Sequence, residues 1–124
     1  MISARYGHGA VTCQGSAFVI GGTNGKADLD SIEKYDNFTN SWQEMSPLIE
    51  RVCMPSVCSF GSKIYVFGGQ EEQDKPAKVQ IYETKTNEWS IGSRLRSPSN
   101  PIAACSNGGN IWVLGKHERK RAQA

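Results

Sequence analysis

The chain repeats itself at an offset of 47 residues, and this period constrains its fold more than any other feature of the sequence. The residues that recur are a glycine pair, a Thr-Asn pair and two aromatic residues: Gly21-Gly22 with Gly68-Gly69, Thr39-Asn40 with Thr86-Asn87, Tyr35 with Tyr82, and Trp42 with Trp89. Adding the offset twice aligns Phe18 with Trp112 and Gly21 with Gly115, so the sequence contains the beginning of a third copy. Periods of about 20 to 50 residues are typical of solenoids and propellers, whose repeats bury their apolar faces against their neighbours.

Each copy has the apolar pattern of β-strands. Apolar residues alternate with polar ones or form short blocks bounded by Gly, Asn or Ser, which predicts strands and not helices. The predicted strands are 9–12, 17–22, 31–35 and 41–45 in the first copy, 55–60, 63–69, 77–82 and 88–90 in the second, and 103–106 and 110–115 in the third. We therefore predict an all-β fold, a partial β-propeller with two four-stranded antiparallel blades and a terminal two-stranded hairpin.

The repeat divides the chain into four parts. Blade 1 is predicted to span 1–46, blade 2 to span 47–93, and the first half of blade 3 to span 94–115. The remaining 116–124 is a basic tail that continues no strand of the repeat, since Lys116 stands where a second glycine is expected. Such a tail is typical of a segment added by an alternative exon, by read-through or by cloning.

The recurring residues have two different structural roles. A glycine pair at the end of a strand lets the backbone crowd against a neighbour and leave the strand sharply. Large amphipathic rings fill the wedge between neighbouring sheets. We therefore predict that the Tyr and Trp side chains of both copies are mostly buried between sheets, and that the glycines, Gly115 included, end the inner strands.

Charge and composition exclude several classes of protein. The net charge is +2, but the last nine residues hold four basic residues and one acidic residue. The rest of the chain therefore has ten basic and eleven acidic residues, which lacks the basic patch of a nucleic-acid-binding protein. No apolar run approaches the roughly 20 residues that span a bilayer, and the first residues lack the apolar core of a signal peptide. We expect a cytoplasmic location, with a nuclear one as the alternative, and no membrane partner.

The residue types needed for catalysis or metal binding do not form a recognisable set. The four cysteines contain no CxxC pair, and His8 and His117 lie far from metal-ligand spacing. No nucleophile with an adjacent base and no paired carboxylates stand out. The sequence therefore predicts a protein that is not an enzyme and that binds no cofactor or metal.

These motifs resemble those of a known family. A double glycine, thirteen residues to a tyrosine and seven more to a tryptophan resemble the kelch repeat, and the resemblance covers 4–115. The segment from Met45 through Pro47 to Arg51 further resembles the kelch domains of BTB-BACK-kelch proteins. Arg5, which precedes His8, looks like the same element one blade earlier. The seam 89–98 lacks this Met-x-Pro form, and family propellers have about six blades.

The resemblance implies a function in protein recognition. BTB-BACK-kelch proteins are substrate receptors of cullin-RING ubiquitin ligases, in which the propeller binds a target protein while the BTB and BACK portions bind cullin-3. No segment of this chain resembles either portion, so we expect cullin-3 to be reached only through a BTB domain absent here. The alternative is a kelch scaffold of another kind, such as one that binds actin-associated cytoskeletal proteins.

In that family, loops between the second and third strands and between successive blades form the face that receives the target. Varied loops on a rigid scaffold are also where recognition is usually placed. The candidate binding residues here are Arg5, Tyr6, His8, Asn24, Lys26, Arg51, Met54, Glu71, Glu72, Asp74 and Asn100. The alternative for any one of them is a solvated turn without a partner.

The incomplete repeat also predicts self-association. About three repeats are the usual minimum for a stable stack, and two and a half fall short. The strand at 110–115 is predicted to have no further strand outside it, which leaves an unpaired edge. We expect a marginally stable chain that pairs with itself or with another kelch chain.

Overall fold

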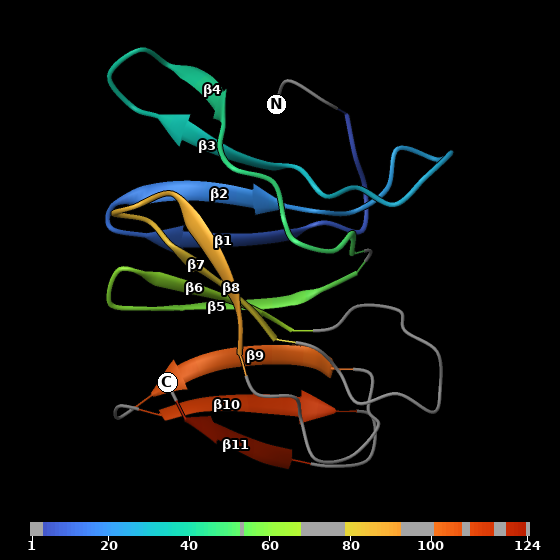
Figure 1. Ribbon diagram of the computed structural model, residues 1–124, viewed down its shortest axis with the longest axis vertical. Helices are drawn as coiled ribbons and strands as arrows, with labels where there is room; N and C mark the ends of the chain where they lie inside the picture. The colour runs from blue at the N-terminus through green and yellow to red at the C-terminus, as the bar shows by residue number, and fades with distance from the viewer. Residues whose placement is uncertain are drawn as a thin grey trace.

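The computed structural model describes residues 4–52, 54–67, 79–92, 101–107, 110–115 and 119–123, and these residues form three antiparallel sheets (Figure 1). Sheet 1 contains β1 (Gly9–Cys13), β2 (Ser16–Ile20), β3 (Ile32–Asp36) and β4 (Ser41–Glu44) in sequential order. Sheet 2 contains β5 (Ser56–Phe60), β6 (Lys63–Phe67), β7 (Val79–Glu83) and β8 (Glu88–Ile91) in the same order. Sheet 3 contains β9 (Pro101–Asn107), β10 (Asn110–Gly115) and β11 (Arg119–Gln123). The all-β class and the two four-stranded blades are confirmed.

The repeat of the sequence is also a repeat of strand register. Tyr35 lies opposite Trp42 in sheet 1, and Tyr82 lies opposite Trp89 in sheet 2. The turns before these tryptophans end on Asn40 and Asn87, whose φ angles of 51° and 57° are left-handed. Asparagine tolerates this conformation better than most residues, which explains why Asn recurs at the end of both turns.

The three sheets lie in a row, from sheet 1 at the top of Figure 1 to sheet 3 at the bottom. The first strand of each sheet lies beside the first strand of the next, so β1, β5 and β9 are neighbours. Side chains alternate across a strand, so each sheet has two faces that can be covered. This row of side-by-side antiparallel sheets is the arrangement of propeller blades.

One apolar core fills the space between sheets 1 and 2. Its buried residues are Cys13, Phe18, Ile20, Ile32, Leu48, Val52, Ile64, Val66 and Tyr82. A second cluster lies on the opposite face of sheet 2 and contains Cys58, Tyr65, Phe67 and Val79. Neighbouring residues of β6 therefore enter different cores, because Ile64 belongs to the first and Tyr65 to the second.

The prediction of a terminal two-stranded hairpin was wrong in one respect, because sheet 3 has a third strand. β11 pairs antiparallel with β10, with Ile111 opposite Ala122 and Leu114 opposite Arg119. Residues that were assigned to a tail outside the fold therefore cover the edge of β10 that was predicted to be unpaired. Strand pairing depends on backbone hydrogen bonds, so a polar sequence without the repeat's motif can add a strand to an open edge.

The aromatic residues of the two copies differ in burial. Tyr82 is fully buried between sheets 1 and 2, as predicted. Tyr35, Trp42 and Trp89 are only half-buried, so the prediction that the rings of both copies are mostly buried between sheets was wrong for both rings of blade 1 and for the tryptophan of blade 2. Tyr35 and Trp42 pack against each other with ring centroids 5.2 Å apart. The two tyrosines differ because the face of sheet 2 that holds Tyr82 packs on sheet 1, whereas no described sheet covers the equivalent face of sheet 1.

Candidate protein-binding face

Three connecting segments meet at one end of sheets 1 and 2, on the right of Figure 1. They are the segment before β1, the β2–β3 connection and the β4–β5 connection, and we call this end the loop face. Backbone hydrogen bonds join Tyr6 to Thr23 in both directions, at 3.1 and 2.9 Å. The N–H of Met54 donates to the carbonyl of Gly7 at 2.7 Å. These bonds connect loops of successive blades into one surface.

The glycine pair allows this close approach. Gly21 and Gly22 have φ angles of 63° and 94°, which L side chains rarely adopt. A Cβ on Gly21 would lie 2.7 Å from the carbonyl oxygen of Val52, and one on Gly22 would lie 2.7 Å from that of Tyr6. The absence of side chains here lets the β2–β3 connection contact both blade-joining segments. The equivalent Gly68 and Gly69 lie outside the described residues.

We predict that Gly22→Ala destabilises the chain more than Gly15→Ala. Both glycines have left-handed φ angles, 94° and 78°, so both substitutions carry the conformational cost of roughly 1–2 kcal/mol. A Cβ on Gly15 would meet no atom within 4 Å, whereas a Cβ on Gly22 would meet backbone at 2.7 Å. Urea unfolding should therefore give a free energy of unfolding lower for Gly22→Ala by a further ~1–3 kcal/mol. Equal losses at the two positions would contradict the close approach at Gly22.

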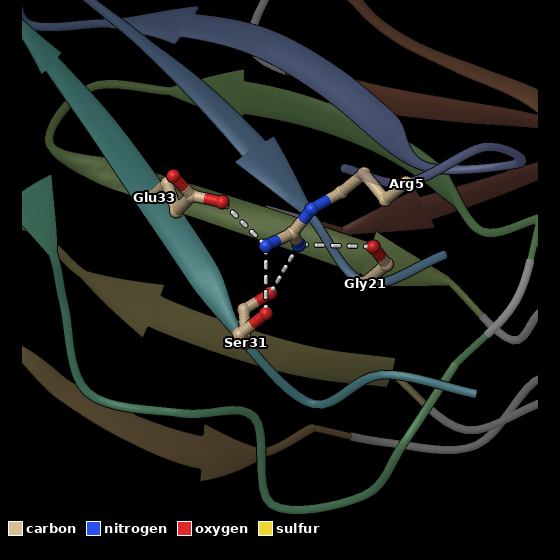
Figure 2. A network of polar contacts seen from close by, with 4 residues as sticks. All are labelled: Arg5, Gly21, Ser31 and Glu33. Carbon is tan, nitrogen blue, oxygen red and sulfur yellow. Dashed lines mark hydrogen bonds and ion pairs between the residues drawn. The ribbon is translucent and has the colours of Figure 1, made fainter. Parts of the chain in front are cut away.

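Arg5 does not belong to the accessible part of the loop face, which corrects its assignment as a binding residue. Its side chain and that of Glu33 are fully buried and form an ion pair at 2.5 Å (Figure 2). Nη1 donates to the carbonyl oxygens of Gly21 and Ser31, each at 3.0 Å, and Nη2 donates to Ser31 Oγ at 2.8 Å. A planar guanidinium suits such a set of acceptors. Arg5 thus fixes the segment before β1 to the ends of β2 and β3.

A second buried polar residue has the same role one blade later. Gln80 occupies the position of Glu33 in the repeat and is 2% exposed. Its amide accepts from the Glu50 N–H and donates to the Glu50 carbonyl, each at 3.1 Å. In both blades, a buried polar side chain of the third strand therefore holds the segment that leads into that blade. Glu33, Ser31 and Gln80 were not predicted from the sequence, although a polar residue repeated within an apolar strand is a signal that could have found them.

Among the predicted binding residues, Tyr6 and Met54 are the large apolar ones that are exposed, with exposed fractions of 63% and 57%. The bond between Met54 and Gly7 brings them together on the loop face. Met54 also has a left-handed φ of 56°, which is uncommon for a long side chain and typical of functional sites. Ile49, which was not predicted, is 51% exposed in the same β4–β5 connection.

The remaining predicted residues have smaller or undescribed contributions. Arg51 is exposed, and its Nη1 donates to the Asp28 carbonyl at 3.4 Å. Asn24 Oδ1 accepts from the N–H groups of Lys26 and Ala27, so Asn24 shapes its own turn while Lys26 extends from it. His8 is half-buried beside Gly22. The candidates that lie outside the described residues are Glu71, Glu72, Asp74 and Asn100.

Burial raises the pKa of three side chains of the inner strands and core. The pKa of the Cys13 thiol is raised mainly by burial and further by the charge of Glu83. Burial also raises the pKa of Tyr65 and that of Tyr82. These groups therefore keep their protons in the folded chain at a pH where the unfolded chain loses them.

The raised pKa values predict a loss of stability at alkaline pH. From neutral pH to the ordinary cysteine value of 9.0, these three groups should leave the free energy of unfolding level, and it should fall as pH rises past that value and past the ordinary tyrosine value of 10.0. The sign follows because the unfolded state binds fewer protons in this range. Chemical unfolding at successive pH values measures the effect. Tyr82→Phe should make the fall above pH 10 shallower, and an unchanged slope would contradict the assignment to Tyr82.

The described residues contain no helix long and apolar enough to cross a membrane. Within the same ranges, no group of three or more His, Cys, Asp and Glu side chains is placed to hold a metal ion. Among the described cysteines, Cys13 is buried in the first core and Cys58 in the second.

The row of sheets and the loop face define a class of protein, the β-propeller repeat proteins that present loops at one end of their blades. Comparison with known families gives the particular family. The family model of the Kelch motif matches residues 4–49 and 51–96, and each match covers one blade and its connection. The chain therefore belongs to the kelch-repeat family, and the predicted resemblance is confirmed.

Relatives among well-described proteins belong to the kelch-like group. The chain is 38% identical over 66 residues to Kelch-like protein 35 of Mus musculus, which covers 53% of this chain and 12% of the relative. It is 39% identical over 66 residues to Kelch-like protein 7 of Rattus norvegicus, covering 53% and 11%. It is 37% identical over 62 residues to Kelch-like protein 6 of Homo sapiens, covering 50% and 10%. The matched part thus spans only about a tenth of the length of these relatives.

Proposed function

We propose that the chain is a protein-interaction module whose loop face binds a target protein in the cytoplasm. The observation that carries this proposal is the pair of exposed apolar side chains, Tyr6 and Met54, held by backbone bonds between two blade-joining segments. Exposed aromatic and methionine side chains are suited to protein contacts, and on a backbone that is already fixed little backbone entropy is lost on binding. The buried Arg5–Glu33 pair fixes the segment before β1, and the Gln80–Glu50 bonds fix the β4–β5 connection.

We further propose that the module is part of the substrate-recognition propeller of a cullin-RING ubiquitin ligase adaptor. The segment from Met45 to Arg51 and the similarity to kelch-like proteins support this role. The chain itself should not bind purified cullin-3, which in such adaptors contacts the BTB and BACK portions. The competing proposal is a cytoskeletal kelch scaffold, and the nature of the bound protein separates the two.

Affinity capture from cell lysate with three forms of the chain tests the loop face. The wild-type chain and Phe38→Ala should retain the same proteins, because Phe38 is fully exposed at the opposite end of sheet 1. The double variant Tyr6→Ala/Met54→Ala should lose them by about tenfold or more, since truncating a central interface residue typically costs over 1 kcal/mol. Equal retention by all three forms would contradict the loop face as the binding site.

The ligase role has its own test with the captured proteins. If they are ubiquitylation substrates, their levels in cells should rise when cullin-RING ligases are inhibited. If actin or actin-associated proteins dominate the captured set and their levels do not respond to the inhibitor, the cytoskeletal alternative is favoured and the ligase role is contradicted.

A further inference from the structure

An Asn-Gly sequence lies in the β2–β3 connection, which extends outward on the loop face (Figure 1). Asn24 and Gly25 are both exposed, so water reaches the side chain and the peptide bond that joins the two residues. Gly25 has a left-handed φ of 91°, and a Cβ built on it would lie 3.7 Å from the Tyr6 hydroxyl, in ordinary contact. Because glycine has no side chain, nothing on this residue hinders a reaction at its backbone nitrogen.

The turn folds the Asn24 side chain back over this peptide bond. Its Oδ1 accepts from the N–H of Lys26 at 2.9 Å and from the N–H of Ala27 at 3.0 Å. The bond to Lys26 closes a ring of atoms that contains the Gly25 nitrogen, so the Cγ of Asn24 is held close to that nitrogen. Two backbone N–H groups that donate to one carbonyl oxygen are also the arrangement that stabilises an oxyanion.

Thr23 fixes the same turn on its other side. Its Oγ1 accepts from the Gly25 N–H at 3.1 Å and donates to the Ala27 carbonyl at 3.0 Å. The first bond orients the peptide nitrogen, and the second keeps the turn closed. Nitrogen and carbonyl carbon are thus brought together before any reaction, which is the condition that makes an intramolecular step fast.

We propose that Asn24 is a site of self-modification, at which the Gly25 nitrogen attacks the Asn24 Cγ. A bond forms between these two atoms, the Cγ–Nδ2 bond breaks, and Nδ2 leaves as ammonia with the proton of the Gly25 N–H. Water then opens the resulting succinimide ring at either carbonyl, which gives aspartate or isoaspartate and needs no further reactant. The charge that develops on Oδ1 is stabilised by the Lys26 and Ala27 N–H groups. The folded chain therefore reacts faster than the unfolded chain.

The modification changes the loop face. Aspartate adds a negative charge two residues before the exposed Lys26. Isoaspartate also inserts a methylene group into the backbone next to Thr23, whose two backbone bonds hold the exposed Tyr6. Target binding is therefore weakened as the modified fraction grows. This consequence rests on the proposed function, whereas the chemical step does not.

Peptide mapping of the 124-residue chain after incubation at neutral pH tests the site. The tryptic peptide 6–26 contains Asn24 as its only asparagine, so the exchange of NH2 for OH in this peptide reports the reaction. Methyl transfer by an isoaspartate-specific methyltransferase separates isoaspartate from aspartate. The rate in the folded chain should exceed the rate in urea by about threefold or more, the ratio that one net hydrogen bond supplies.

Two variants separate the turn from the Asn-Gly sequence alone. Thr23→Val keeps the side-chain shape and removes both Oγ1 bonds, so its folded rate should fall toward the rate in urea. Gly25→Ala places a Cβ beside the attacking nitrogen and should slow the reaction in both states. Circular dichroism shows whether each variant keeps its strands. A folded rate at or below the rate in urea, or a Thr23→Val rate equal to that of the wild-type chain, would overturn the proposal.

The effect on the loop face has a separate readout. In the lysate capture, incubated wild-type chain should retain less target than freshly purified chain, and Gly25→Ala should change less over the same time. Equal retention before and after extensive modification of Asn24 would overturn the proposed effect on binding. If the fresh chain captures no protein at all, the proposed function is contradicted, while the mapping still decides the modification site because it needs no partner.

Discussion

Tyr82→Ala is expected to lower the free energy of unfolding by about 3–5 kcal/mol, the usual cost of removing a large buried ring. Tyr82 is fully buried in the core between sheets 1 and 2, where it contacts Phe18 edge-on and Trp89 at a centroid distance of 4.9 Å. Its hydroxyl also donates to Asn87, whose Oδ1 in turn accepts from the N–H of Ser46, just after β4 of sheet 1. The substitution would therefore leave a cavity and loosen the contact between blades.

Phe38→Ala is the matched control for Tyr82→Ala, because Phe38 is an aromatic residue that is fully exposed. Its replacement should change the free energy of unfolding by less than about 0.5 kcal/mol, as for most surface substitutions. Tyr82→Phe keeps the ring and removes the hydroxyl, so an intermediate loss of ~1 kcal/mol is expected. Urea unfolding followed by circular dichroism gives all three values, and comparable losses at Tyr82 and Phe38 would contradict the blade packing.

Arg5→Met is the second substitution with a large expected effect. Removing one member of a buried ion pair typically costs about 3–5 kcal/mol, because the remaining charge stays in a poorly solvated position. Here the carboxylate of Glu33 would lose its guanidinium, and the carbonyl groups of Gly21 and Ser31 would lose their donor. Arg5→Lys should be less costly, since an ammonium keeps the charge but cannot serve all these acceptors at once.

A double substitution distinguishes the buried charge from a general loss of packing. Replacing both members of a buried pair by apolar residues is often neutral or stabilising. Arg5→Met/Glu33→Leu should therefore be more stable than Arg5→Met in urea unfolding. If the double variant is instead less stable by the sum of the two single losses, the ion pair is not the interaction that makes Arg5 important.

The sequence predicted the blades well because their information is local and repeated. Alternating apolar residues and turn residues recur at one offset, and each strand of sheets 1 and 2 begins and ends within about two residues of its predicted bounds. Tyr82 was predicted to be buried on the same basis. The identical pattern misled at Tyr35, because burial also depends on whether a neighbouring sheet is present, and local pattern contains no information about that.

Local sequence patterns could not predict the burial of Arg5 or the strand β11, for different reasons. An arginine in a connecting segment looks like a surface residue, and only the three-dimensional placement of Glu33, Ser31 and Gly21 turns it into a buried one. β11 was missed because the pairing of a polar segment is decided by the open edge of β10 and not by its own apolar pattern. Both cases concern a partner that lies far away in the sequence or outside the repeat.

Nuclear Overhauser spectroscopy of the labelled chain tests the side-by-side packing of the blades most directly. Cross-peaks are expected between the rings of Phe18 and Tyr82, and between the Trp89 indole N–H and Ser46. This indole proton should also exchange slowly, because it donates a hydrogen bond of 2.7 Å to the Ser46 carbonyl. A folded spectrum without these cross-peaks, in which the Trp89 indole proton exchanges as fast as that of a solvent-exposed indole, would contradict the packing of sheet 2 on sheet 1.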